Sequence, residues 1–505
     1  MYNKILFIVY SFLILGLFAQ NDSRRDYVWV MGDLGGLNNP SEPLWRNTTL
    51  TFSPDSLVVD TITYRYMSFW RSAAMLSDTS GHLLLYTNGF RIHNGADEML
   101  INGQGLNLGI NNNNINRGNW IHKGDLVLPI PDQPDKYILL HCAVLQPYQP
   151  VAVYQNLIDM SVNNGQGELI VANQEIVNGG YLYGGLTACR HANGQDWWIL
   201  LHKYNSDCFV RLLLSPDGIS IRGEQCIGLW ETTEGIWDAV YSPDGSKYIY
   251  YSDTDEKICI FDFDRCNGEL ANPVIFEALA SIQTWDPGIA VSPNSRFLYH
   301  SVGTELHQYD LDAEDIEQSR YLVGEYDGYM SPFQNPNLDR TYFSHPELAP
   351  NGKIYINTGA QTNKLHTIHS PNKRGDSCNF VQHDIGIKMN GQAIPNFPNF
   401  RLGALSGSGC DTLTSVGEPI KDIGYASIYP NPARSDAAIS WRLPSGVSTA
   451  TLQITGSLGQ MVCTEILPTP EGKISLPLAH LPKGMYFYRI FHSEGQLYSG
   501  KLWKE

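Results

Sequence analysis

The chain has 505 residues, of which 43% are hydrophobic and 17% charged, so it can bury a sizeable core and is not a disordered chain. Acidic residues outnumber basic ones by 51 to 34, which gives a formal net charge of −17. Because no basic stripe accompanies it, this charge argues against nucleic acid as a partner and against adhesion to an anionic membrane. We interpret the acidic excess as solvated loops.

The first residues predict export. Lys4 precedes an apolar run at residues 5–18, which ends at Ala19 before the polar string QNDSRRD. A charged start, a short apolar middle and a small-residue exit are typical of a secretory signal peptide, and the run is too short for a good membrane span. We therefore assign residues 1–19 to a signal peptide. We expect export to the periplasm and no transmembrane segment in the mature chain.

The clearest repeating unit is GIWDAVYSPDGSKYIYYSDTDEKICIFDFD at residues 235–264. An apolar run, a Ser-Pro-Asp-Gly turn, an aromatic run, a polar loop and an alternating run predict an antiparallel meander. The same order recurs along the chain, with first turns near Ser77, Pro131, His191, Ser242, Ser292 and Ala349. A step of roughly fifty residues with four strands per unit is typical of β-propeller blades.

The repeats occupy residues 27–403, which we assign to one β-propeller. Seven blades are favoured by the length of this span, and six blades with an N-terminal appendage are the alternative. The seventh blade would combine two pieces from each end, namely DYVWVMG and residues 57–69 with NFVQHDIG and IPNFPNFRLG. Such closure would leave no exposed sheet edge.

A second body follows the repeats. Residues 404–424 lose their large apolar side chains and are assigned to a linker. Residues 425–505 alternate short strand-like runs with Pro and Gly turns, which predicts a small immunoglobulin-like β-sandwich. The fold class is therefore all-β.

The sequence holds nine cysteines, so an exported chain leaves at least one unpaired. A tight turn at residues 215–218 would place Cys208 opposite Gln225, one residue short of Cys226. A disulfide between Cys208 and Cys226 therefore needs a bulge that corrects the register. Cys378 with Cys410 is a second candidate pair.

Residues just before each innermost strand are the candidate binding residues, because they would surround the mouth of the central channel. They are Arg71, Trp237, Asp238, Trp285, Asp286 and His345. Such a set can bind a sugar, a peptide end or a divalent ion. Alternatively, the carboxylates bond turn amides and the tryptophans pack between blades. Common hydrolase, zinc-protease and nucleotide motifs are absent from the sequence, so we assign no catalytic residue, no cofactor and no metal ligand.

The tail resembles the C-terminal sorting domain of proteins exported by the type IX secretion system of Gram-negative bacteria. The resemblance rests on YPNP at residues 429–432, on ITGSLGQMV and LPKGMYFYRI, and on the closing KLWKE. The motif positions carried over to this sequence are Pro430, Asn431, Pro432, Gly459, Gly484, Tyr486 and Lys501. The resemblance implies that the type IX machinery is a partner. It also implies that the protein is secreted or attached to the outer cell surface.

The front body is similar to the WD40-like propellers that often precede such sorting domains, a family that implies no defined activity. Two functions follow. We favour a secreted or surface binding protein of the adhesion type, with a glycan or protein ligand. The alternative is a propeller enzyme acting on polysaccharide, a glycoside hydrolase or lyase, with Asp238, Asp286 or His345 as acid and base.

Overall fold

The computed structural model describes residues 24–32, 47–54, 56–61, 65, 67–107, 118–143, 151–181, 184–231, 236–252, 255–278, 287–331, 340–360, 362–410, 425–429, 431–443, 447–456, 460–492 and 495–504. The predicted signal peptide lies outside these ranges, as does most of the predicted linker. Within the described ranges, no helix is long and apolar enough to cross a membrane.

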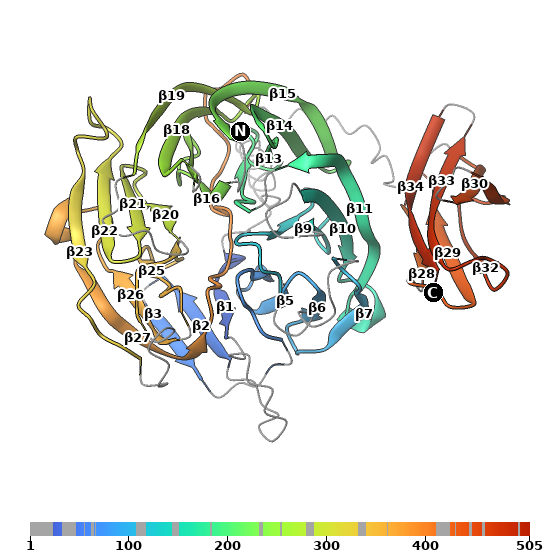
Figure 1. The fold of residues 1–505 in the computed structure, drawn as a ribbon, viewed down its shortest axis with the longest axis horizontal. Coiled ribbons are helices and arrows are strands. Elements are labelled where there is room, and N and C mark those ends of the chain that lie inside the picture. The colour runs from blue at the N-terminus through green and yellow to red at the C-terminus, as the bar shows by residue number, and fades with distance from the viewer. Residues whose placement is uncertain are drawn as a thin grey trace, which may run out of the picture.

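Seven groups of antiparallel strands surround a central channel, so the chain forms a seven-bladed β-propeller (Figure 1). The first blade has three strands, and each of the other six has four, which run outward from the channel in chain order. The first three blades contain β1 (Val28–Met31), β2 (Thr48–Ser53) and β3 (Ser56–Asp60); β4 (Ala74–Ser77), β5 (Leu83–Thr87), β6 (Arg91–Asn94) and β7 (Met99–Gln104); β8 (Asp125–Pro129), β9 (Lys136–Ala143), β10 (Val151–Asp159) and β11 (Glu168–Tyr181). A parallel pairing of Glu168 with Ile101 joins β11 to β7, which makes blades two and three one continuous sheet.

The remaining four blades repeat the four-stranded pattern. They contain β12 (Ala188–Arg190), β13 (Trp197–His202), β14 (Ser206–Ser215) and β15 (Gly218–Glu231); β16 (Ile236–Tyr241), β17 (Lys247–Ser252), β18 (Lys257–Asp264) and β19 (Glu269–Glu277); β20 (Gly288–Val291), β21 (Phe297–Val302), β22 (Glu305–Asp310) and β23 (Tyr321–Glu325); β24 (Pro346–Leu348), β25 (Ile354–Ile356), β26 (Thr362–Ile368) and β27 (Phe380–Asn390). Two short 3₁₀ helices, η3 (Asn163–Gly165) and η4 (Gly375–Cys378), precede β11 and β27. The favoured count of seven blades is confirmed.

Every predicted first turn joins the innermost strand of a blade to its second strand. In the fifth blade, Asp244 Oδ1 accepts hydrogen bonds from the Ser242 hydroxyl at 2.6 Å and the Ser246 amide at 3.0 Å, and Gly245 has a φ of 72°. A side-chain acceptor and a glycine at positive φ stabilise such a turn locally. The turns are therefore determined by their own residues.

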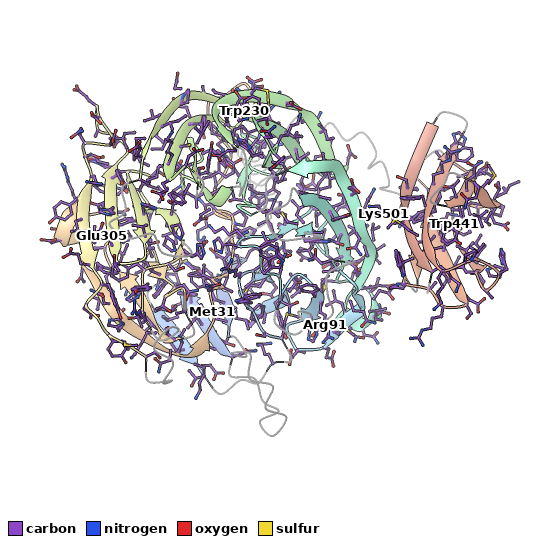
Figure 2. All side chains as sticks on the ribbon, viewed as in Figure 1. Met31, Arg91, Trp230, Glu305, Trp441 and Lys501 are labelled. Atoms are coloured by element: carbon purple, nitrogen blue, oxygen red, sulfur yellow. A yellow bond between two sulfur atoms is a disulfide. The ribbon has the colours of Figure 1, made fainter. Side chains whose placement is uncertain are left out.

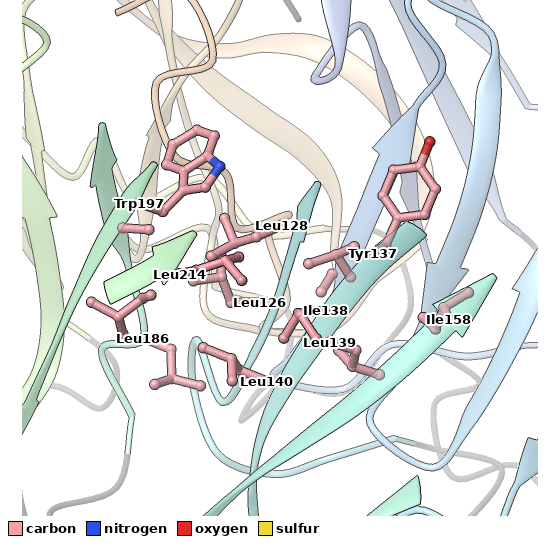
Figure 3. Packing of buried hydrophobic residues seen from close by; sticks show 14 of the residues in the cluster. Leu126, Leu128, Tyr137, Ile138, Leu139, Leu140, Ile158, Leu186, Trp197 and Leu214 are labelled. Carbon is pink, nitrogen blue, oxygen red and sulfur yellow. The ribbon is translucent and has the colours of Figure 1, made fainter. Parts of the chain in front are cut away.

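Apolar side chains on the facing sides of adjacent blades form the core. The largest cluster runs from the second blade to the fourth and is shown in part in Figure 3, with Leu126, Leu140 and Leu214 among its fully buried members. A separate cluster joins the first blade to the last, where Trp29 and Phe52 meet Tyr355. Each blade therefore buries both faces against its neighbours, and the ring is closed by apolar packing.

The first blade differs from the others in the direction of its strands. The Ser77 amide at the end of β4 donates to the Arg25 carbonyl before β1 at 2.7 Å, and the Phe69 amide before β4 donates to the Gly32 carbonyl after β1 at 2.8 Å. β1 therefore runs antiparallel to β4, the direction of a second strand rather than an innermost one.

Residues 391–403, which contain IPNFPNFRLG, line the channel beside this blade without forming a regular strand. In Figure 1 the orange chain after β27 runs along the inside of the ring. The Asn396 amide donates to the Ala73 carbonyl at 3.1 Å, while its side-chain amide donates to the carbonyls of Asp125 at 3.1 Å and Leu186 at 2.7 Å. The Phe397 ring lies 6.1 Å from that of Trp29.

The expected closure from both ends is thus right in part. DYVWVMG contains β1, and IPNFPNFRLG lies beside it. NFVQHDIG was misassigned, because it forms β27, which pairs with β26 as the outermost strand of the last blade. A complete alternating strand pairs with its sequence neighbour in preference to a distant edge.

The Cys208–Cys226 disulfide is formed, and the bulge that it requires is present. Arg211 pairs with Gly223 and Leu212 with Ile221, so Arg222 is the extra residue that brings the two cysteines opposite each other. The second candidate pair is wrong, since Cys378 is a buried free thiol that is not bonded to Cys410.

The tail forms two sheets that pack as a small β-sandwich. One contains β28 (Tyr425–Tyr429), β29 (Asp436–Arg442) and β32 (Glu471–Pro477), and the other contains β31 (Met461–Leu467), β30 (Ala450–Gly456), β33 (Gly484–His492) and β34 (Gly495–Lys504). Trp441 of the first sheet and Leu452 of the second belong to one buried cluster, and Figure 2 shows Trp441 inside this body.

Asn396→Ala should lower the free energy of unfolding by about 1–3 kcal/mol, because two buried carbonyls on the third and fourth blades lose their donor. Urea unfolding of the purified protein would measure the change. Gln318→Ala is the control, since it removes an exposed amide and should change stability by less than about 0.5 kcal/mol. Equal effects of the two substitutions would contradict the role assigned to residues 391–403.

Candidate binding site in the central channel

The structure brings together three of the six predicted channel residues. Asp238 lies in β16, His345 immediately precedes β24, and Arg71 precedes β4. Trp285 and Asp286 lie outside the described residues, and the Trp237 side chain is also outside them, although its backbone belongs to β16. The binding role of all six remains a prediction.

Lys123, which the sequence analysis did not select, lies at the centre of the site. It is in the turn before β8, and its ammonium group lies 2.8 Å from Asp238 Oδ1 and 3.7 Å from Glu347 Oε2. Burial of the ammonium disfavours its charged form, but the two carboxyl groups outweigh this effect and raise the pKa of Lys123. Asp238 Oδ2 also accepts a 3.0 Å hydrogen bond from the Ile289 amide, so this carboxylate is held from two sides.

Two histidines lie against this ion pair. The rings of His122 and His345 are stacked with centroids 3.1 Å apart and planes 10° apart, and both side chains are buried. Burial lowers the pKa of both imidazoles well below the usual value; for His345 the positive charges of Lys123 and Arg71 add to this effect. Both rings are therefore neutral at physiological pH.

The innermost strands approach each other closely here. Gly288 begins β20, and a Cβ atom at this position would lie 2.8 Å from the Cα of His345. No other residue type fits without displacing the backbone. This contact places the start of β20 directly against His345. The amide of the next residue, Ile289, donates to the Asp238 carboxylate.

A cavity of about 240 Å³ lies at the centre of the ring, and its lining includes Asp26, Lys123, Glu347 and Arg401. Arg401, from the segment that crosses the channel, donates to Asp26 from two nitrogens, Nη1 at 2.8 Å and Nη2 at 2.7 Å. Ile289, Pro346 and Phe397 provide apolar walls. The cavity therefore combines charged groups with apolar surface, as small-molecule sites do.

Two of the acids that line the cavity are weakened by burial. Burial raises the pKa of Glu347 to about 8, against the opposing charge of Lys123. Burial also raises the pKa of Asp26 to about 6, against the opposing charge of Arg401. At neutral pH Glu347 is mostly protonated, so it can donate one hydrogen bond and accept others.

The rule that selected Arg71 and His345, a polar residue just before an innermost strand, also applies to His122 and Lys123 in the string HKGDLVL. This signal was available in the sequence. Glu347 carries no such signal, because it lies inside the three-residue strand β24, where a charge is not expected to face the channel.

The carried-over sorting motif has a structural role in the tail. The Asn431 side chain donates to the Lys501 carbonyl at 2.8 Å and accepts from the Trp503 amide at 2.8 Å, which ties YPNP to β34. The Tyr486 hydroxyl donates to the Pro482 carbonyl at 2.8 Å. Pro432 follows Asn431, and Gly484 begins β33. Pro430 and Gly459 lie outside the described residues.

Residues 427–505 match the family described as the secretion system C-terminal sorting domain. A crystal structure of a putative 6-phosphogluconolactonase from Bacteroides fragilis has a TM-score of 0.46 at 12% identity, covering 73% of this chain and 97% of that one. The periplasmic gluconolactonase of Pseudomonas aeruginosa has a TM-score of 0.45 at 10% identity, covering 72% and 96%. No curated protein sequence matches the chain.

A further similarity is to the β-propeller domain of Cps50 (Swd1) from Myceliophteria thermophila, with a TM-score of 0.36 at 10% identity, covering 61% of this chain and 89% of that one. The chain is a seven-bladed β-propeller protein. It ends in a type IX secretion-system sorting domain, which implies contact with that machinery and either secretion across the outer membrane or attachment to the cell surface.

The contribution of Glu347 to stability should fall as the pH rises from about 4.5 to 8, because its pKa is raised from 4.5 to about 8. The folded protein holds this proton more tightly than the unfolded chain does, so the contribution is complete below pH 4.5 and is lost toward pH 8. Glu347→Gln should therefore lose less stability than the wild type between pH 5 and pH 8 in urea titrations. The exposed Glu277→Gln should follow the wild type; identical slopes for all three would refute the assignment.

Asn431→Ala should destabilise the tail by about 1–2 kcal/mol, because β34 loses two hydrogen bonds. Expressed in a bacterium with a type IX system, the variant should accumulate in the periplasm at the expense of the surface and medium fractions. Immunoblots of the separated fractions would measure this shift. Lys473→Ala, an exposed change in the same body, should be exported as the wild type is.

Proposed function

We propose that the protein is a secreted or cell-surface binding protein of the adhesion type that holds the end of a glycan in its central channel. The observation that carries this proposal is the cavity of about 240 Å³ with five acidic or basic side chains in its lining, those of Asp26, Lys123, Arg190, Glu347 and Arg401. Glu347 lies on the innermost strand β24 and Lys123 in the turn before β8, whereas Asp26 and Arg401 lie outside the strands. A rigid site of this kind binds without a large ordering cost.

The chemistry of the lining fits sugar hydroxyl groups. The protonated Glu347 both donates and accepts hydrogen bonds, the Lys123 ammonium donates, and Asp26 accepts. The apolar wall formed by Pro346 and Phe397 suits the carbon–hydrogen face of a sugar ring. The volume lies below the roughly 300–1,000 Å³ of pockets for drug-sized ligands, so one sugar residue is the expected occupant.

The enzyme remains the second candidate function because of Glu347, although Asp238 does not support it. Asp238 is fully buried and bonded to Lys123 and to the Ile289 amide, which makes it a poor acid or base for a substrate in the cavity. Glu347, by contrast, lines the cavity and stays mostly protonated near neutral pH, as a general acid for glycosidic cleavage must. Asp26 is the second carboxyl group in the lining.

A glycan array with the mature chain, residues 20–505, tests the proposal, followed by calorimetry with the best ligand. Glu347→Ala should weaken binding about tenfold, because one buried hydrogen-bonding group is lost. Glu347→Gln should bind within about threefold of the wild type, because the amide reproduces the protonated acid. Glu277→Ala is the exposed control and should bind as the wild type does.

The same variants separate the two functions. If the wild type cleaves the bound glycan and Glu347→Gln binds but does not cleave it, the enzyme alternative replaces the binding proposal. If the folded wild type retains no glycan, or if Glu347→Ala binds as tightly as the wild type, the channel is not a glycan site.

A further inference from the structure

Three potential metal ligands from three blades converge behind the cavity wall. His122 precedes β8, Asp238 lies in β16, and His345 precedes β24. One ligand atom from each lies within 4.8 Å of the other two, and all three side chains are buried. Because more than a hundred residues separate each from the next, the sequence spacing gave no indication of this cluster.

The histidine nitrogens are the second, independent observation. Among the residues that the structure describes, neither nitrogen of His122 and neither nitrogen of His345 has a hydrogen-bond partner. A buried polar group without a partner is strongly unfavourable, and four occur in one pair of stacked rings. Apolar side chains would pack here without this penalty. The presence of histidine at both positions therefore indicates that a ligand binds to the lone pairs of the imidazole nitrogens.

The carboxylate is already oriented for such a ligand. Asp238 Oδ1 is held by Lys123 at 2.8 Å, and Oδ2, which accepts from the Ile289 amide at 3.0 Å, faces His345 Nδ1 at 3.9 Å. In metal sites, neighbouring residues that do not bind the ion usually hydrogen-bond the ligating side chains and orient them. Lys123 thereby acts as a positioning residue for Oδ1 and leaves the second lone pair of Oδ2 available.

We propose that His122, Asp238 and His345 bind a zinc-type transition-metal ion, with a fourth position open to water or to a ligand. Two imidazoles and one carboxylate suit Zn²⁺, whereas Ca²⁺ and Mg²⁺ prefer oxygen ligands alone. Three protein ligands with an open position are the arrangement of catalytic rather than structural zinc.

Binding requires a small local movement. Ligand atoms about 2.1 Å from a tetrahedral ion lie roughly 3.4 Å apart, so the set must close by roughly 1 Å. Two parallel rings cannot both direct a nitrogen in its own plane at one ion, so the imidazoles must rotate apart.

Zinc binding to the mature chain, after removal of metal with EDTA, tests this inference independently of any glycan. Calorimetry with ZnCl₂ and elemental analysis should show one ion per chain. An excess of zinc of about 100-fold over its Kd should raise the Tm by about 3–6 °C. His122→Gln and His345→Gln should each weaken zinc binding at least tenfold, while His202→Gln, a buried histidine of the fourth blade, should leave it unchanged.

A further variant keeps the test valid if a glutamine variant folds poorly. His122→Leu should have an equal or higher Tm than the wild type in EDTA, because an unpartnered buried group is removed, and its Tm should not respond to zinc. Absence of zinc binding in the wild type, or equal binding by the wild type and the His122→Leu variant, would overturn the proposal.

Discussion

Each blade of this protein has two apolar faces, and both must be covered for the ring to be stable. Six of the seven interfaces join neighbours in the chain, but the one between the first and last blades joins segments more than three hundred residues apart. Trp29 and Phe52 meet Tyr355 there, and the Lys388 amide of β27 donates to the Thr48 hydroxyl of β2 at 2.8 Å. The geometry of the channel depends on this closure, because every innermost strand is positioned by its two neighbours.

Closure of the ring also explains why charged side chains lie buried at its centre. The loops before the innermost strands carry polar side chains that would face water in an open sheet. In the ring they meet one another, and Lys123 lies between the carboxyl groups of Asp238 and Glu347. An uncompensated buried charge is strongly destabilising, whereas this arrangement pairs the ammonium with two acids. The second acid then takes up a proton at neutral pH, since one ammonium does not stabilise two buried carboxylates equally well.

The parts of this fold that could be predicted from the sequence are those stabilised by interactions between residues close together in the chain. The turn that follows Ser242 is stabilised by its own side chains, so it and its counterparts in the other blades are visible in the sequence. Counting residues across one hairpin showed that a Cys208–Cys226 disulfide needs a bulge, and the structure places that bulge at Arg222. The cluster of Lys123, Glu347 and His122 could not be found in this way, because it exists only once the ring has closed. NFVQHDIG was misassigned because strand pattern alone does not identify a partner strand.

Residues 391–403 also determine where mechanical tension enters the propeller. They lie between the last blade and the sorting domain, so a pull on the tail is transmitted first to this segment. The Leu405 amide donates to the Ala192 carbonyl at 2.8 Å, and Arg265 holds the Gly403 carbonyl. Both anchors belong to loops of the fourth and fifth blades, three and two positions around the ring from the last blade. A pull on the tail therefore loads these hydrogen bonds before it reaches the last blade.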